Sequence, residues 1–407
     1  MLLQNGTICD HKQHKKADIR IQNGIITEIQ THLAPHNNEE IYDCHHKVIL
    51  PALIDMAYPK NKTLSLKTLQ TLGQKALSGG IGTIILRPDT TPKIDSEAMI
   101  EFIHSFNSTS NIQFIPCVSP IKDNALNTLS TLVSNGARAI VVRREMDNYT
   151  LYKISQYASM LEIPLIASPQ DLSLSDGVID ESELSFELGL PGVLGIAQTI
   201  EVATFSELAR FSRIELVFDA ITERQSFCII EEFKKMGAKL ITQTPIHHLL
   251  FTHKHCSDYD TRFKLFPPLK DEDTRAFLIQ NLNSSIDMLT SLQSDTYKSA
   301  KDQVFENASF GINAFAFYFA LGYEFLVKPK IIDLSRFSYL TSYAQAKLFG
   351  LNKGEISEGR DADLIIVDLD SHTFVKDAFN PYDNQTLQSQ ITSIFLNGVS
   401  INPNNPL

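Results

Sequence analysis

The periodicity of hydrophobic and polar positions changes twice along the chain. Near the start, residues 18–22 alternate, the pair Asn23-Gly24 follows, and a second strand-like run covers 25–29. Alternation with a period of two predicts strands with one buried face, and an Asn-Gly pair between two such runs predicts a tight hairpin. Residues 1–52 are therefore expected to form an antiparallel β unit.

The middle of the chain carries unbroken apolar runs with amphipathic stretches of helical period between them. Unbroken runs are typical of parallel strands that are buried on both faces, and the stretches between them predict helices that cover the sheet. The number of runs is sufficient for a (β/α)8 barrel, although counting alone does not separate a barrel from a doubly wound sheet. The runs include Thr83–Leu86, Ile112–Cys117, Ala139–Val142, Pro164–Ala167, Ile214–Phe218 and Lys239–Thr242.

The end of the chain returns to β structure. Residues 363–368 form a strand-like run, and a later run leads into the hairpin pair Asn397-Gly398. Strand-rich ends on both sides of an αβ middle indicate that the termini meet in one domain. The expected fold class is α/β, with a (β/α)8 TIM-like barrel over 53–345 and a composite β-sandwich formed by 1–52 and 355–407.

Charge and composition exclude several classes of protein. The chain has 36 Lys and Arg residues against 47 Asp and Glu residues, a formal net charge of −11, which gives no electrostatic footprint for nucleic acid. Its apolar runs are shorter than the roughly 18 to 20 residues of a membrane span, and its start lacks the basic and apolar segments of a signal peptide. The 5 cysteines are scattered and odd in number, which favours a reduced, cytoplasmic protein.

Six segments carry recognisable motifs: Val48–Met56, Pro88–Pro92, Glu187–Val193, Pro245–Leu250, Pro267–Lys270 and Gly359–Leu364. In this order they resemble the dihydroorotase branch of the amidohydrolase superfamily, and the resemblance extends over nearly the whole chain. It implies a metal-centred barrel with a composite β-sandwich, which hydrolyses a cyclic amide during pyrimidine biosynthesis.

The same resemblance implies a site that this sequence does not complete. The family normally holds zinc with a His-x-His pair at the first strand and histidines at the fifth and sixth strands, and an Asp at the eighth strand takes a proton from water. Here every one of these positions holds another residue, although a shift of one position would put Asp219 at the sixth strand. We therefore expect no zinc, no other metal cofactor and no catalytic residue. The degenerate positions are Ala57, Pro59, Ser168, Phe218 and Leu292.

Three charged residues are expected to remain at the barrel mouth: Asp89, Arg143 and Asp219. Asp219 is expected to be a structural carboxylate that faces Arg143 or Arg144. The alternative is that the arginine pair points into the mouth and binds an anion, because a guanidinium matches the geometry of carboxylate and phosphate. Asp89 lies between Pro88 and Pro92, and proline geometry predicts a rigid loop there.

Two further clusters have competing interpretations. The histidine-rich cluster has the side-chain types that bind zinc, but it resembles a long surface loop, so a solvated polar loop is expected and adventitious metal binding is the alternative. It comprises His247, His248, His253, His255 and Cys256. The aromatic cluster is expected to be helix core, or in part a subunit contact. It comprises Phe310, Phe315, Phe317, Tyr318, Phe319, Tyr323 and Phe325.

These observations predict a catalytically inactive dihydroorotase-like protein. The resemblance implies that such chains act as scaffolds or regulatory partners of aspartate carbamoyltransferase in pyrimidine biosynthesis, within a homo- or hetero-oligomer. One alternative is an active dihydroorotase or related cyclic amidohydrolase with a divergent site. A third possibility is a small-molecule sensor that reuses the barrel mouth.

Overall fold

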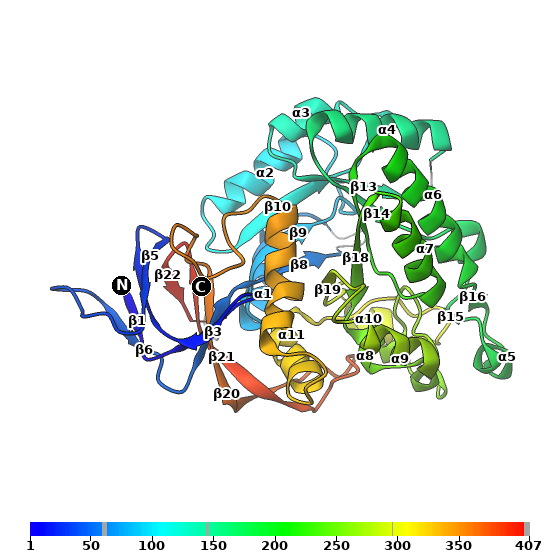
Figure 1. Ribbon diagram of the computed structural model, residues 1–407. Coiled ribbons are helices and arrows are strands. Elements are labelled where there is room, and N and C mark those ends of the chain that lie inside the picture. Colours follow the sequence, from blue (N-terminus) through cyan, green and yellow to red (C-terminus); the bar gives the residue numbers. More distant parts are fainter. Residues whose placement is uncertain (59–62, 144–145, 295, 403–407) are drawn as a thin grey trace.

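A barrel of eight parallel strands forms the centre of the molecule, and strands that follow one another in the chain are also neighbours in the barrel (Figure 1). The computed structural model describes residues 1–58, 63–143, 146–294 and 296–402. A parallel bridge between Ala57 and Gln293 joins the first strand to the segment after the last. The barrel strands are β8 (Leu53–Ala57), β9 (Ile81–Leu86), β10 (Gln113–Val118), β13 (Ala139–Arg143), β14 (Leu165–Ser168), β17 (Glu215–Phe218), β18 (Lys239–Pro245) and β19 (Met288–Thr290).

Amphipathic helices cover the outside of the barrel (Figure 1). The first of them illustrates why they form: Ser65 caps its N-terminus, and Leu69, Leu72 and Ala76 recur at helical spacing on its buried face. These helices are α1 (Leu66–Ser78), α2 (Glu97–Asn107), α3 (Leu129–Ser134), α4 (Asn148–Leu161), α6 (Ile196–Ser212), α7 (Arg224–Lys235) and α9 (Glu272–Gln280).

Side chains on the barrel strands alternate between two hydrophobic cores. The core inside the barrel contains Met56 from β8 and Val217 from β17. The core between the strands and the helices contains their chain neighbours Ala57 and Phe218. Since strand side chains repeat every two residues, this alternation also decides which residue at each strand end faces the barrel mouth.

The two ends of the chain form a β-sandwich beside the barrel, at the left of Figure 1. One sheet is N-terminal only, whereas the other pairs N-terminal with C-terminal strands, for example Ile49 opposite Ile366. The fold class predicted from the sequence is therefore confirmed. The sheets contain β5 (Ile25–Gln30), β4 (Asp18–Gln22), β1 (Leu2–Gln4) and β6 (Ile41–Asp43), and β22 (Val399–Ile401), β21 (Thr386–Leu396), β20 (Leu364–Phe374), β7 (Val48–Pro51), β2 (Thr7–Cys9) and β3 (His14–Lys16).

Both predicted hairpin turns are present. Asn23 and Gly24 have φ values of 51° and 79°, and Asn397 and Gly398 have values of 49° and 72°. Positive φ at both central residues is what a tight hairpin requires, and asparagine and glycine adopt it at little cost. These two pairs therefore fix the turns between β4 and β5 and between β21 and β22.

Short elements complete the connections. Within the described residues, no helix has the length and apolar character that a membrane crossing requires. The short strands and α-helices are β11 (Ile121–Lys122), β12 (Ala125–Leu126), β15 (Ile179–Asp180), β16 (Gly192–Val193), α5 (Glu183–Leu188), α8 (His247–Leu250), α10 (Lys298–Lys301), α11 (Tyr318–Gly322), α12 (Leu334–Ser338) and α13 (Ala344–Leu348). Turns of 3-10 helix cover Leu172–Leu174, His253–Cys256, Thr261–Phe263 and Phe315–Phe317, and π-helical turns cover Tyr323–Val327 and Tyr339–Tyr343.

Candidate functional site

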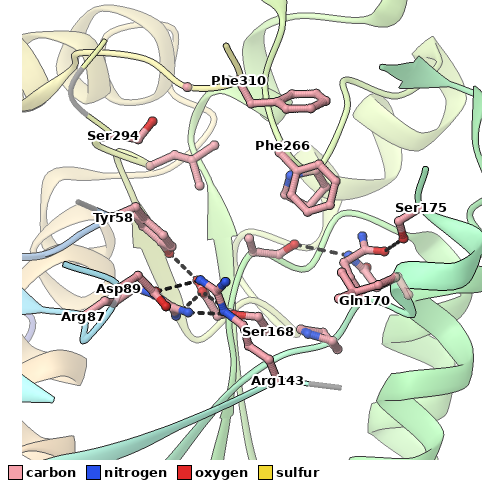
Figure 2. Close-up of a pocket in the computed structure, with 18 residues that line it drawn as sticks. Tyr58, Arg87, Asp89, Arg143, Ser168, Gln170, Ser175, Phe266, Ser294 and Phe310 are labelled. Carbon is pink, nitrogen blue, oxygen red and sulfur yellow. Dashed lines mark hydrogen bonds and ion pairs between the residues drawn. The ribbon is translucent and has the colours of Figure 1, made fainter. Parts of the chain in front are cut away.

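A pocket of about 330 Å³ opens at the C-terminal ends of the barrel strands. This is the end at which barrel enzymes carry their active sites, because the loops that follow the strands converge there. Polar residues from several strand ends form one side of the pocket, and the aromatic rings of Phe266 and Phe310 lie at the other (Figure 2). The polar lining includes Tyr58, Arg87, Asp89, Arg143, Ser168 and Asp219.

Arg87 is the centre of the polar side. It directly follows β9, and its side chain is 1% exposed. Its Nη1 lies 2.7 Å from Oδ2 of Asp219, and its Nη2 donates to Oγ of Ser168 at 2.9 Å. Its Nε donates to Oδ2 of Asp89 at 3.2 Å. The Tyr58 hydroxyl donates to the other Asp219 oxygen, and the Tyr58 ring centroid lies 5.2 Å from Cζ of Arg87.

Arg143 belongs to the same network but is closer to solvent. Its Nη2 donates to Oδ2 of Asp89 at 2.7 Å, and its side chain is 36% exposed. The prediction that Asp219 faces Arg143 or Arg144 is therefore wrong for Arg143, because Arg87 holds Asp219 and Arg143 holds Asp89. Arg144 lies outside the described residues.

The two carboxylates respond differently to this environment. Burial raises the pKa of Asp219 above its ordinary value, although Arg87 opposes the increase. Burial also acts to raise the pKa of Asp89, but Arg87 and Arg143 outweigh it and lower that pKa. For Arg87, burial acts to lower the pKa, and the two carboxylates reverse the effect and raise it. The network therefore holds two cationic side chains against two carboxyl groups, with almost no solvent around its centre.

The aromatic side of the pocket is formed by two residues that lie in loops, Phe266 and Phe310. The rings of Phe266 and Phe310 meet edge to face, with centroids 5.4 Å apart. Lys264 lies beside Phe310: its Nζ is 4.8 Å from the Phe310 ring centroid and donates to the carbonyl oxygen of Phe305 at 2.6 Å. Phe310 was expected in a helix core, and this prediction is wrong, because the residue lies in a loop before the helical region.

Because side chains alternate along each strand, some of the residues predicted from the resemblance line the pocket and others point into the outer core. Ser168 and Leu292 line the pocket, as do Asp89, Arg143 and Asp219. In contrast, Ala57 and Phe218 point into the core between strands and helices. Their chain neighbours Tyr58 and Asp219 line the pocket instead. Pro59 lies outside the described residues.

The groups at the mouth do not fit a zinc centre. Zinc sites in proteins are built from imidazole, thiolate and carboxylate ligands that converge on one point. The two carboxylates here, Asp89 and Asp219, already accept hydrogen bonds from Arg87, whose positive charge stands between them. Within residues 1–58, 63–143, 146–294 and 296–402, no three His, Cys, Asp or Glu side chains form a group that could hold a metal ion.

The histidine-rich cluster is not a solvated loop, so that prediction is wrong. His247 is fully buried between the Tyr382 hydroxyl and the carbonyl oxygen of Ser291, each 2.8 Å from a ring nitrogen. Burial lowers its pKa to about 4. His248, His253 and Cys256 are also buried, but at separate places, and only His255 is exposed. These side chains pack the loops beside the mouth and do not converge on a common point.

Sequence reasoning missed the two residues that hold the network together, Arg87 and Tyr58. Arg87 lies between two segments that were noted for other reasons, the run Thr83–Leu86 and the loop that begins at Pro88. A charged residue directly after an unbroken apolar strand was the available signal, since strand ends of a barrel meet at its mouth. Tyr58 gave a weaker signal, because only the inward or outward direction of β8 distinguishes it from Ala57.

Comparisons with known proteins agree with this architecture. Residues 274–401 match the model of the amidohydrolase family. The chain is 32% identical to a probable dihydroorotase-like protein of Helicobacter pylori (strain ATCC 700392 / 26695), over 98% of this chain and 97% of the relative. It is 29% identical to a dihydroorotase of Acetivibrio thermocellus, over 98% and 96% of the two chains. Among solved structures, an L-hydantoinase from Arthrobacter aurescens superimposes with a TM-score of 0.88 at 17% identity, covering 98% and 95% of the two chains.

Proposed function

This chain belongs to the dihydroorotase-like proteins of the amidohydrolase family, and from that premise we propose that it is a non-hydrolytic scaffold of pyrimidine biosynthesis. Its barrel would assist assembly or regulation of aspartate carbamoyltransferase and would not open a cyclic amide itself. The observation that carries the proposal is the position of Arg87. A fixed cation lies between the two carboxylates of the mouth, where a hydrolase of this family would need free ligands and a free base.

The first test asks whether the protein performs the reaction at all. The wild-type gene is placed in a strain that lacks its only dihydroorotase, with an active dihydroorotase gene as the positive control. No growth is expected without added pyrimidine, because Arg87 already holds both Asp89 and Asp219, the carboxylates that the described part of the mouth offers to activate water. Growth that is lost again in Asp219→Ala would overturn the proposal and assign the chain to the active cyclic amidohydrolases.

A metal measurement separates the same two functions in the purified protein. The scaffold proposal predicts well under one equivalent of zinc, manganese or iron by elemental analysis. Stoichiometric metal that disappears in Asp89→Ala or Asp219→Ala would contradict it, because these are the carboxylates available at the mouth. Stoichiometric metal that disappears in His253→Ala would indicate a site in the histidine-rich cluster instead, and would equally contradict the predicted metal content.

An exposed apolar surface on two adjacent outer helices supports the partner part of the proposal. Helices α4 and α6 pack together, with the rings of Tyr152 and Phe211 5.9 Å apart. Phe211 is nevertheless 67% exposed and Met160 is 65% exposed. Aromatic and methionine side chains are enriched at protein interfaces. Those on the two helices are Tyr149, Tyr157, Met160, Ile196, Ile200 and Phe211.

The partner is tested by co-purification with aspartate carbamoyltransferase from the same cell. Phe211→Glu and Met160→Glu are expected to abolish retention, because a buried charge in an interface carries a large desolvation cost. Phe374→Glu is the matched control, since Phe374 is an exposed aromatic residue in the β-sandwich, away from both helices. Equal retention of all three variants would remove this surface from the proposal. Failure of the wild-type protein to retain the enzyme would contradict the partnership itself.

A second candidate function, binding of a small molecule without turnover, is supported by the pocket itself. A volume of about 330 Å³ with one aromatic and one polar side is at the lower end of the range of small-molecule sites. Dihydroorotate and its open-chain product carbamoyl aspartate are the probes. A rise in melting temperature with either compound in the wild type, but not in Phe266→Ala, would support this function. No rise with either compound would exclude both compounds as ligands.

A further inference from the structure

The side chains at the barrel mouth form a cation-binding site, and the bound cation is a side chain of the same protein, the guanidinium of Arg87. Two carboxylates, a serine hydroxyl and a tyrosine ring surround the Arg87 guanidinium. They come from four different places in the barrel, after β8, after β9, at the end of β14 and after β17. Without Arg87, the carboxylate of Asp219, whose side chain is 3% exposed, would be buried without a cation in contact with it, which is strongly unfavourable.

We infer that Arg87 replaces the metal ion of the family's barrel as an internal cation, and that the strand ends are held together by it. The inference concerns the stability of the barrel, so it goes beyond the scaffold proposal and does not depend on it. Ser168, which resembles the family's fifth-strand histidine position, is a hydrogen-bond partner of Arg87, and so is Asp219, which takes the sixth-strand position if the resemblance is shifted by one residue. The site has therefore kept a central positive charge while its imidazoles are gone.

The geometry also explains why Arg143 cannot take over this task. Arg143 reaches Asp89 from the open side of the mouth, and its side chain remains partly in solvent. Among the described residues, Arg87 is the cation in contact with Asp219, at 2.7 Å, and the Tyr58 hydroxyl donates to the other Asp219 oxygen. Removal of the Arg87 side chain would therefore leave a space of guanidinium shape, lined by two carboxylates, at the centre of the strand ends.

That space gives the inference a direct test by chemical rescue. Arg87→Ala is expected to lower the melting temperature by several degrees, and free guanidinium ion at low millimolar concentration is expected to restore at least half of the loss with a saturable dose response. Sodium chloride at equal ionic strength should restore much less, because sodium does not form the directed hydrogen bonds. Guanidinium should not raise the melting temperature of the wild type.

Two control variants decide between this site and general binding. In Arg87→Ala with Asp219→Asn, rescue should largely disappear, because one of the carboxylates is gone. Arg336→Ala is a matched arginine variant elsewhere: in the part of the chain that the structure describes, the Arg336 side chain donates to the carbonyl oxygens of Leu282 and Ile286 and to no carboxylate. Equal rescue of Arg336→Ala, undiminished rescue of the double variant, or no rescue of Arg87→Ala would overturn the inference.

A second comparison covers the case in which Arg87→Ala does not fold. Arg87→Lys keeps a positive charge at the site, whereas Arg87→Met keeps similar bulk without it. The inference predicts that Arg87→Lys retains clearly more stability than Arg87→Met. Equal melting temperatures of these two variants would show that charge has no part in holding the strand ends. Neither result depends on whether the wild-type protein hydrolyses a cyclic amide.

Discussion

Each of the two domains contains an arginine with an almost fully buried side chain, and the two arginines connect different kinds of partner. In the β-sandwich, Arg20 is 2% exposed and donates to Glu28 and Glu39 at 2.8 and 2.9 Å. Its partners all lie within a short stretch of chain. In the barrel, Arg87 is 1% exposed and bonds residues as distant in sequence as Asp219. Arg20 therefore ties a local turn to its own sheet, while Arg87 ties separate strand ends to one another.

The pKa values of Glu39, the partner of Arg20, and of Asp219, the partner of Arg87, are shifted in opposite directions. Arg20 lowers the pKa of Glu39 to about 2. Burial raises the pKa of Asp219 although Arg87 contacts it directly. Glu39 lies near the edge of a small domain, whereas Asp219 is enclosed by the barrel and its loops, where removal from water costs more. An arginine–carboxylate pair therefore lowers the carboxyl pKa in the β-sandwich, whereas in the barrel the burial of Asp219 outweighs the effect of its arginine.

The largest effect is expected from Arg87→Met, because it leaves Asp219 buried without its cation. The free energy of unfolding should fall by about 3–5 kcal/mol, the usual cost of removing one partner from a buried pair. Arg87→Met combined with Asp219→Leu should recover much of this loss, as measured by urea unfolding. A double variant that loses as much as the sum of its single variants would show that the pair is not coupled.

The loss in Arg87→Met should also depend on pH in a defined direction. The pKa of Asp219 is raised in the folded protein, and without Arg87 it should rise further. Protonation removes the need for a counter-charge, so the difference from the wild type should shrink as pH falls through the raised pKa of Asp219 towards the ordinary value of 3.8. A difference that stays constant over this range would assign the loss to packing alone.

Arg20→Met should have an intermediate effect, about 1.5–3 kcal/mol, because hydrogen bonds to charged partners are lost at the edge of a domain. The folded pKa of Glu39 lies at about 2, below its ordinary value of 4.5. Its stabilisation is therefore complete above pH 4.5 and is lost as pH falls towards 2. Unfolding curves of wild type and Arg20→Met should converge only in this more acidic window. If the unfolding curves of wild type and Arg20→Met converge near neutral pH, the Arg20 and Arg87 sites do not differ in their pH dependence as proposed.

Tyr58→Phe should have a smaller effect, about 1–2 kcal/mol. It removes the hydroxyl that donates to Asp219 but leaves the ring beside Arg87. Thermal unfolding measures the loss, and Arg87→Met/Tyr58→Phe tests whether both residues act through the same carboxylate. Strictly additive losses would place Tyr58 outside the network.

Arg143→Gln should have the smallest effect, below about 1 kcal/mol, because partly exposed ion pairs contribute little. Asp89 keeps its bond to Arg87 in this variant. If Arg143→Gln lowers the free energy of unfolding as much as Arg87→Met in the same experiment, the partly exposed Arg143 stabilises the barrel as much as the buried Arg87.

The fold could be predicted from the sequence because its signals are local. Unbroken apolar runs, amphipathic stretches and the pairs Asn23-Gly24 and Asn397-Gly398 each act over a few residues, and their order leaves few possible arrangements. The site was harder to predict, because it depends on the direction of each strand end. Counting positions by resemblance selected Ala57 and Phe218, which point to the outer core, instead of their chain neighbours.

The pairing of Arg87 with Asp219 could not be predicted for a different reason. A long-range ion pair depends on which side chain reaches which strand end in three dimensions. The sequence places three arginines, at 87, 143 and 144, near strand ends that also carry Asp89 and Asp219. Arg143 was the plausible partner of Asp219 by charge alone, yet its position on β13 brings it to Asp89. Only the arrangement of the strands around the barrel decides between them.

The sheet that joins both ends of the chain has a consequence for how the protein is made. Strand β7 is synthesised early, but its partner β20 emerges from the ribosome roughly 300 residues later, on the order of tens of seconds at typical rates. During that interval one edge of β7 has no strand beside it, and an open edge readily pairs with the wrong segment. We expect the β-sandwich to mature last, so nascent chains would be most vulnerable to aggregation while their barrel is already complete.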